Sequence, residues 1–101
     1  MTNMQKNKLM GQLAEVYSKH DVRNNGFTVI SSRGVGYDFL AVKISRNYSM
    51  VWFVEVKFNQ SRLSKPQRKF MHLCKKLGMN YLVYRVSPSQ LYFWLAKRSG
   101  F

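Results

Sequence analysis

The chain has 101 residues, too few to build a second core, so we expect a single domain over residues 1–101. Its one cysteine, Cys74, excludes an internal disulfide and a cysteine-cluster zinc site. The lack of a long apolar run or an apolar signal-peptide core predicts a soluble, cytoplasmic protein. With 17 Lys and Arg against 4 Asp and Glu, the net charge is +13, which favours nucleic acid as the partner over a ribosomal-type role or an anionic membrane surface.

The first predicted element is a helix over residues 4–24. Its apolar residues recur at the spacing of one helix face. They are Leu9, Met10, Leu13, Val16 and Tyr17. Asn25 and Gly26 tolerate left-handed backbone, so we expect them to end the helix.

Three strands are predicted next. Residues 27–32 form a short β-branched run, and residues 33–36 form a turn. Residues 37–44 and 50–58 read as two strands that a hairpin through residues 45–47 joins. Side chains two apart share a face, so the last of these strands carries Glu55 and Lys57 on one face and only apolar residues on the other.

Residues 64–77 form the clearest predicted helix, with Ser64 as its N-cap and Gly78 as its C-terminal stop. Its apolar stripe consists of Phe70, Leu73, Cys74 and Leu77. The opposite face consists of Lys65, Arg68, Lys69, His72, Lys75 and Lys76. Because this face carries no acid, we interpret it as a DNA-phosphate contact surface, with mere solubility as the alternative.

The chain ends in a strand at residues 80–86 and an element at residues 89–97 that is either helix or strand. Within it, the apolar residues 91–95 form either the last part of the core or a homodimer face. The order of elements is therefore α-β-β-β-α-β plus a C-terminal element. This order predicts an α/β fold with one mixed central sheet flanked by helices.

The acids are few enough that their positions are informative. Asp38 and Glu55 lie in predicted strands, where acids are poorly represented, and a hairpin can bring them together. Two carboxylates are hard oxygen ligands that suit Mg²⁺ or Mn²⁺. Lys57 beside them could position an attacking water or stabilise a negatively charged transition state. The alternative is an ordinary cross-strand ion pair between Lys57 and either acid, which the spacing alone favours.

Three motifs carry a resemblance to the PD-(D/E)XK nuclease superfamily. They are Gly-Tyr-Asp-Phe-Leu-Ala-Val at residues 36–42, Phe-Val-Glu-Val-Lys at residues 53–57 and Arg-Leu-Ser-Lys-Pro-Gln at residues 62–67. Residues 54–86 are similar to VRR-NUC domains, and the part before residue 38 is similar to archaeal-type Holliday junction resolvases. The resemblance implies a restriction-endonuclease-like fold. This sequence departs from the superfamily motif at Tyr37, where the superfamily often has proline.

The resemblance also implies roles for individual residues. Asp38, Glu55 and the backbone carbonyl of Val56 are the implied metal ligands, and Lys57 is the implied catalytic lysine.

Two further residues match the superfamily pattern and have competing explanations. Glu15 matches a first-helix carboxylate that completes the metal site in many members, while an exposed i,i+4 pair with Lys19 explains it equally well. Gln67 matches a glutamine that supports the site or contacts phosphate, and Ser64-x-x-Gln67 is also a capping box.

DNA contacts are expected from Ser31, Ser32 and Arg33 in addition to the basic helix face, with either serine matching the loop serine of resolvases. The leading hypothesis is a Mg²⁺- or Mn²⁺-dependent endodeoxyribonuclease, acting as a homodimer on Holliday junctions or other branched DNA in a prokaryotic or virus-infected cell. The alternatives are a VRR-type nuclease for flaps or repair intermediates, and a non-catalytic basic nucleic-acid-binding module. The intact set of Asp38, Glu55 and Lys57 argues against the last alternative.

Overall fold

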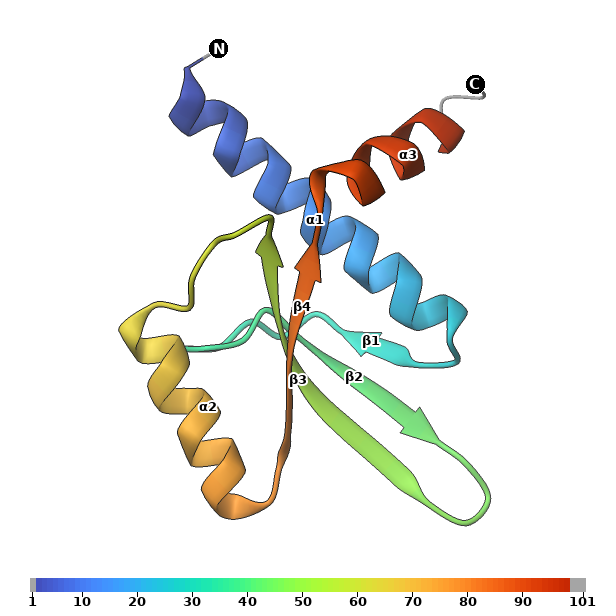
Figure 1. Ribbon diagram of the computed structural model, residues 1–101. Helices are drawn as coiled ribbons and strands as arrows, with labels where there is room; N and C mark the ends of the chain where they lie inside the picture. The colour runs from blue at the N-terminus through green and yellow to red at the C-terminus, as the bar shows by residue number, and fades with distance from the viewer. Residues whose placement is uncertain (1, 99–101) are drawn as a thin grey trace.

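The computed structural model describes residues 2–98, and seven elements make up this part of the chain (Figure 1). In chain order they are α1 (Asn3–Asn24), β1 (Thr28–Ile30), β2 (Phe39–Ile44), β3 (Ser49–Phe58), α2 (Lys65–Leu77), β4 (Asn80–Val86) and α3 (Pro88–Arg98). The predicted order is therefore confirmed, and the C-terminal element is a helix. No helix within residues 2–98 has both the length and the apolar character that crossing a membrane requires.

The four strands form one mixed sheet in the order β1-β2-β3-β4. The β1/β2 and β2/β3 pairs are antiparallel, and the β3/β4 pair is parallel. The predicted hairpin between β2 and β3 is closed by Ser45, whose N–H donates to the Tyr48 carbonyl at 2.8 Å. Parallel neighbours need a long crossover, which α2 supplies. This crossover places the N-terminus of α2 near the end of β3.

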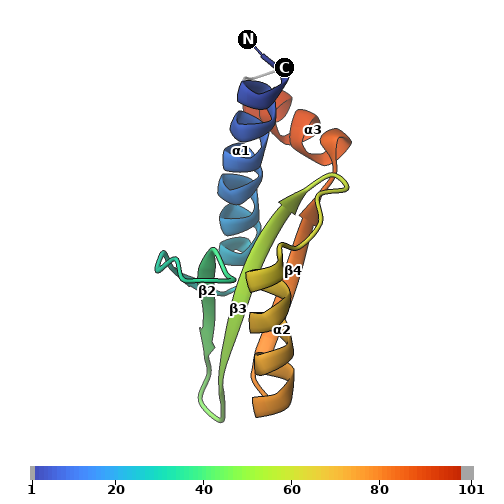
Figure 2. The same ribbon diagram turned by 90° about the vertical axis from the view of Figure 1, so that its left-hand side faces the viewer.

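The two long helices cover opposite faces of the sheet (Figure 2). Side chains alternate along β3, so Val54 packs against Val22 of α1, whereas Phe53 packs against Phe70 of α2. The α2 face is held by a cluster of aromatic rings with centroids 5.0–5.8 Å apart. The cluster consists of Tyr37, Phe53, Phe70 and Tyr81.

The buried face of α1 matches the predicted stripe only in part. Val16 is 52% exposed, whereas Ala14, Ser18 and Val22 are buried at successive i,i+4 positions. These side chains are small, so the helix can approach the sheet closely. The Ser18 hydroxyl donates to the Glu15 carbonyl at 2.8 Å, which satisfies it inside the core. Three of the five predicted apolar residues, Met10, Leu13 and Tyr17, pack around the core as partly buried side chains, whereas Leu9 and Val16 are exposed.

The predicted boundaries of α2 are confirmed. Ser64 caps the helix in a capping box with Gln67, and Gly78 ends it in the left-handed conformation, with φ of 69°. The predicted apolar stripe is only partly buried, since Leu73 and Leu77 are 50% and 61% exposed. The reason is that β4 is the edge strand, so no further strand lies beneath that side of the helix.

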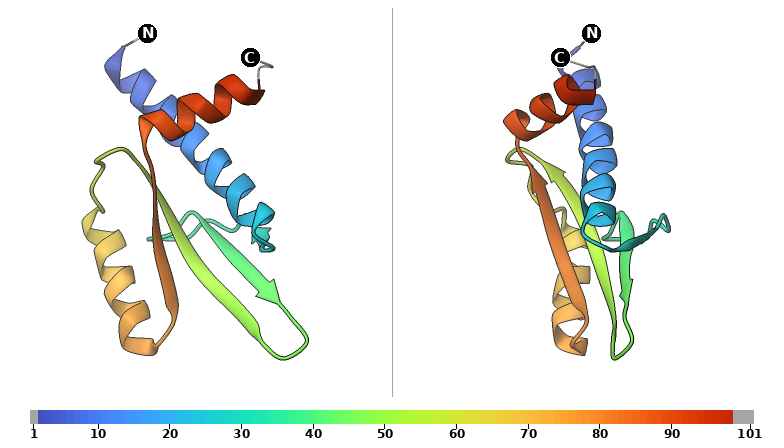
Figure 3. Two further views of the ribbon diagram at one scale, coloured as in Figure 1. Left: turned by 45° about the vertical axis from the view of Figure 1, so that its right-hand side comes forward. Right: turned by 90° about the vertical axis from the view of Figure 1, so that its right-hand side faces the viewer.

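Helix α3, like α1 and α2, begins with a capping box, in which the N–H of Gln90 donates to the Ser87 hydroxyl at 3.2 Å and the Ser87 N–H donates to the Gln90 side chain at 2.9 Å. It packs beside α1 at the end of β4 (Figure 3). Leu91 is fully buried there, whereas Tyr92 and Phe93 are 50% and 71% exposed. The apolar segment 91–95 is therefore part of the core and also leaves an apolar surface.

We expect Leu91→Ala to destabilise the protein by about 2–5 kcal/mol, because it removes a fully buried side chain and leaves a cavity. The neighbouring Tyr92→Ala change is the matched control, since half of that side chain is already in solvent. Urea unfolding followed by far-ultraviolet circular dichroism gives both values. Equal losses in the two variants would mean that α3 does not belong to the core.

Candidate active site

The segment before β2 is fixed by contacts with α2 and β4. Gly36 has φ of 97°, and a Cβ atom there would lie 2.5 Å from Cβ of Phe70. The position therefore needs glycine both for its backbone conformation and for the close approach of α2. The Tyr81 hydroxyl donates to the Gly36 carbonyl at 2.7 Å, which holds the turn against the sheet. This packing sets the position of Asp38, two residues later.

The sequence predicted Asp38 inside a strand. The residue lies instead in a bend just before β2. Its N–H nevertheless donates to the Val54 carbonyl at 2.8 Å, which extends the ladder by one residue. Because Phe39 pairs with Val54, Asp38 stands across from Glu55. One carboxylate oxygen of Asp38 accepts from the N–H of Val56 at 2.8 Å. The structure thus brings the two predicted acids together.

Glu55 is only 3% exposed, and Gln67 holds one of its oxygens. The Gln67 side-chain nitrogen donates to Glu55 Oε1, while its oxygen accepts from the Ser64 N–H at 2.7 Å. Gln67 therefore caps α2 and contacts the buried acid at the same time. The second oxygen, Oε2, is buried and has no hydrogen-bond partner within residues 2–98.

The environment of Glu55 raises the pKa of its carboxyl to about 8. Burial is the largest cause, followed by the neighbouring Asp38 carboxyl, and the positive charges of Lys57 and Arg33 oppose the increase only in part. In the absence of a cation, this carboxyl keeps a proton at neutral pH.

A buried carboxyl with an unpartnered oxygen, next to a second carboxyl, matches the needs of a hard cation. No group of three or more His, Cys, Asp or Glu side chains within residues 2–98 is arranged to hold a metal ion. The available donor set is therefore the carboxylates of Asp38 and Glu55 together with backbone and solvent oxygens. The chemistry of this set fits Mg²⁺ or Mn²⁺ rather than a softer metal.

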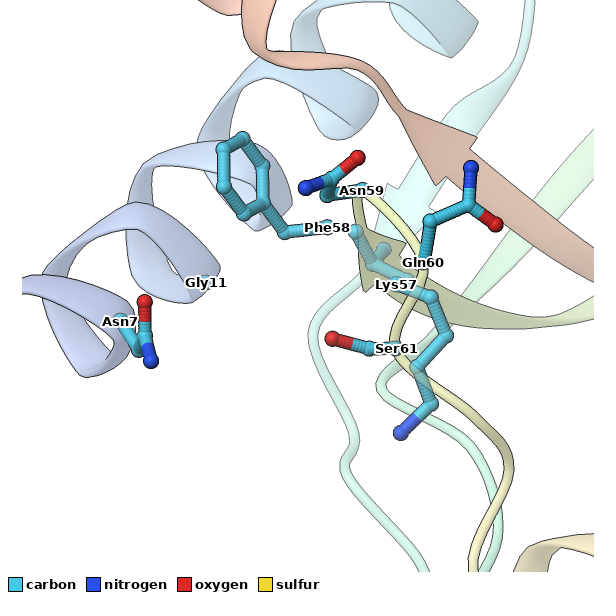
Figure 4. A pocket seen from close by; sticks show the side chains of 8 residues that line it. Asn7, Gly11, Lys57, Phe58, Asn59, Gln60 and Ser61 are labelled. Carbon is cyan, nitrogen blue, oxygen red and sulfur yellow. The ribbon is translucent and has the colours of Figure 1, made fainter. Parts of the chain in front are cut away.

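Lys57 points to the same face of β3 as Glu55 and lines a polar pocket (Figure 4). It forms no ion pair with any acid among the described residues. The ordinary ion pair with Asp38 or Glu55, which the spacing alone had favoured, is therefore not formed. A lysine whose charge is not neutralised by a carboxylate remains available to an anionic ligand.

Glu15 approaches the site through Arg33 rather than by direct contact with the other two acids. The Arg33 guanidinium donates to Glu15 at 2.5 Å and lies 3.6 Å from Asp38. The alternative ion pair of Glu15 with Lys19 is present as well, at 3.5 Å. Arg33 was predicted only as a DNA contact, because a separation of 18 residues along the chain gives no signal of its bridge to Glu15.

The other predicted DNA contacts lie on exposed surface. Ser31 and Ser32 are exposed beside the Arg33 loop, and the Ser31 hydroxyl accepts from Lys19 at 3.2 Å. The six residues of the basic face of α2 are all exposed; they are Lys65, Arg68, Lys69, His72, Lys75 and Lys76. Arg68 is partly engaged, since it donates to the Leu63 carbonyl at 2.7 Å.

Comparisons with known proteins give two findings. A family model described as the VRR-NUC domain matches residues 7–88, a range that contains every site residue named above. A solved structure titled "VRR_NUC domain" is similar with a TM-score of 0.62, over 86% of this chain and 94% of that chain. Its sequence is 22% identical, so the likeness is one of fold. No curated protein shows significant similarity to the chain.

The raised pKa of Glu55 predicts a pH-dependent stability for the metal-free protein. The folded protein binds a proton that the unfolded chain releases near pH 4.5, so the stabilisation is complete below about pH 4.5 and is lost as the pH rises to about 8. We expect Glu55→Gln to remove this loss and to melt at a higher temperature than the wild type at pH 8.5. Thermal unfolding in EDTA measures the melting temperatures of both proteins. An equal fall in melting temperature of the wild type and of Glu55→Gln as the pH rises would contradict the raised pKa of Glu55.

Proposed function

Because this chain belongs to the VRR-NUC domain family, part of the PD-(D/E)XK nuclease superfamily, we propose that it is a divalent-metal-dependent endonuclease for Holliday junctions or other branched DNA. Membership makes it a nuclease-type domain with DNA as its substrate. The observation that carries the proposal is the buried Glu55, with one unpartnered oxygen, next to the partly buried Asp38 and beside Lys57, which forms no ion pair within residues 2–98.

In this proposal Asp38, Glu55 and the Val56 carbonyl hold a Mg²⁺ or Mn²⁺ ion. A bound divalent cation neutralises charge on the scissile phosphate and makes a water molecule more acidic. Gln67 fixes the orientation of the Glu55 carboxylate by its hydrogen bond. Lys57 places its positive charge where the phosphate becomes more negative during hydrolysis.

Arg33 explains how Glu15 contributes to the same site. The Arg33 side chain is 67% exposed and contacts both Glu15 and Asp38, so it holds two carboxylates that a cation also needs. A guanidinium also pairs well with phosphate. We therefore propose that Arg33 contacts the DNA backbone in the complex, which would leave Asp38 to the cation and bring Glu15 close to it as a further negative charge.

The basic face of α2 is the proposed main contact with the DNA backbone, together with Ser31 and Ser32. Six basic or histidine side chains on one exposed surface, with no acid among them, suit contact with phosphates in any sequence. Such contacts orient the DNA without reading its bases, as an enzyme that selects DNA by shape requires. A nuclease for flaps or repair intermediates is the second candidate, and family membership supports it equally.

We further propose that residues 1–101 form one nuclease domain and that the protein acts as a homodimer. Residues 1 and 99–101 lie outside the described part of the chain. A four-way junction needs two symmetric cuts, which a two-fold dimer provides. The exposed Tyr92 and Phe93 of α3 supply apolar surface for such an interface.

We expect the protein to cleave labelled four-way junctions, flaps or both with Mg²⁺ or Mn²⁺, and linear duplex more slowly. Asp38→Asn should lower cleavage at least about 100-fold, because it weakens both the cation site and the charge balance around it. Asp21→Asn is the matched control, since Asp21 contacts Tyr84 on the other face of the sheet. Gel analysis of products measures the rates. No cleavage of any substrate would overturn the enzymatic function.

Binding should depend steeply on salt through the α2 face. Each lost phosphate contact reduces the slope of log affinity against log salt concentration by about 0.9. We therefore expect the double change Lys69→Gln and Lys76→Gln to reduce the slope by about 1–2, measured by fluorescence anisotropy in EDTA. Arg46→Gln, in the hairpin between β2 and β3, removes one charge away from α2 and should leave the slope nearly unchanged. An unchanged slope in the double variant would exclude α2 as the contact.

A further inference from the structure

A polar pocket of about 430 Å³ opens beside Lys57, between α1 and the loop that follows β3 (Figure 4). This volume lies within the range of about 300–1,000 Å³ that is typical of small-ligand sites. Asn7 and Gly11 line it from α1, and Asn59, Gln60 and Ser61 line it from the loop. None of these five residues entered the sequence-based site.

Gly11 lies inside α1 at a position where neither the backbone conformation nor a close contact requires glycine. Glycine in a helix interior is destabilising relative to alanine, and usually marks a turn or a close approach. The φ angle of Gly11 is not in the left-handed region, and a Cβ atom built on it would have no other atom within 4 Å. Gly11 lines the pocket, so the missing side chain leaves this part of the α1 wall open.

The loop wall of the pocket is held in place by the backbone. The N–H of Asn59 donates to the Val86 carbonyl at 2.7 Å, and Asn59 itself adopts the left-handed conformation with φ of 58°. The Arg85 guanidinium donates to the Ser61 carbonyl at 2.7 Å. These contacts use backbone atoms, so the side chains stay available. Within residues 2–98, the side chains of Asn7, Asn59, Gln60 and Ser61 have no hydrogen-bond partner.

The chemistry of the lining is unlike that of the surrounding surface. The protein carries a net charge of +13, yet Lys57 is the one charged residue among the eight that line this pocket. Phosphate sites collect cations, so a mostly neutral lining does not indicate a phosphate pocket. Side-chain amides present a donor and an acceptor together, and this arrangement matches the polar edges of nucleobases.

We propose that this pocket receives one unpaired nucleotide of the cleaved strand, next to the scissile phosphate at Lys57. This inference rests on the proposed nuclease function and specifies the substrate: DNA with an unpaired nucleotide beside the cut. A base inside a duplex cannot enter a space of this size, whereas an extrahelical or flap nucleotide can. Its base and sugar contact the amides and the Ser61 hydroxyl, and its backbone passes close to Gly11.

The test compares binding of two fluorescent duplexes that differ by a single extrahelical nucleotide, measured by anisotropy in EDTA with the full chain. One or two added hydrogen bonds predict about five- to thirtyfold tighter binding of the duplex that carries it. Gly11→Leu projects a branched side chain from the α1 wall into the pocket and should abolish this preference while leaving affinity for the paired duplex unchanged. Gly11→Ala is the matched control for helix stability, and Gln12→Leu, on the exposed side of α1, controls for added apolar surface.

Asn59→Gly gives an independent check, because glycine keeps the left-handed backbone and removes only the amide. It should reduce the preference with little change in thermal stability. The proposal is overturned if the wild type shows no preference, or if Gly11→Leu retains it. Failure of the nuclease function looks different: neither duplex is cut with Mg²⁺ or Mn²⁺, while the difference in binding persists. Cleavage mapping should place the cut beside the extrahelical nucleotide.

Discussion

The burial of Glu55 next to Asp38 is the constraint on which the rest of the site depends. Moving a carboxylate out of water is costly unless a cation or hydrogen bonds replace its hydration, and a second carboxyl alongside adds to the cost. The surrounding contacts meet only part of this demand. The N–H of Val56 and the amide of Gln67 each satisfy one oxygen, while Glu55 Oε2 has no partner within residues 2–98. A buried carboxyl oxygen without a hydrogen-bond partner is typical of a site that a ligand completes.

The unit formed by β3 and α2 explains how so small a chain supports this arrangement. Alternation along β3 sends Val54 and Val56 into the core under α1, and sends Glu55 and Lys57 to the other face. The parallel pairing with β4 then requires a crossover helix, whose first turn contacts Glu55 through Gln67. Gln67 can therefore cap α2 and contact Glu55 with a single amide group.

The distribution of charge follows the same plan. Three of the four acids, Glu15, Asp38 and Glu55, form one network that Arg33 connects, and the fourth, Asp21, accepts a hydrogen bond from Tyr84 inside the fold. The net charge of +13 is spread over the remaining surface and over the outer face of α2. The positive charge that favours approach of a polyanion is thus spread over the protein, while most of the negative charge lies in one place.

The sequence by itself determined the order of the elements, the boundaries and caps of α2, the alternation along β3 and the family. These features are local, since periodicity, capping residues and a short motif are read from neighbours along the chain. The pairing of Asp38 with Glu55 was also predictable, because a hairpin fixes which residues face each other. The buried side of α1 was predictable only in part: Met10, Leu13 and Tyr17 pack on the core as expected, whereas the burial of Ser18 and Val22 depends on how the helix lies on the sheet.

Only the tertiary structure decided the contacts between residues far apart in the chain. The Arg33 bridge from Glu15 to Asp38, the closeness of Gly36 to Phe70 and the pocket between Gly11 and Asn59 all join separate elements. No periodicity or spacing encodes these distances, because they depend on how α1, the turn before β2 and α2 pack on the two faces of the sheet. The sequence thus indicated which acids form the candidate site, whereas the environment that raises the pKa of Glu55 depends on tertiary packing.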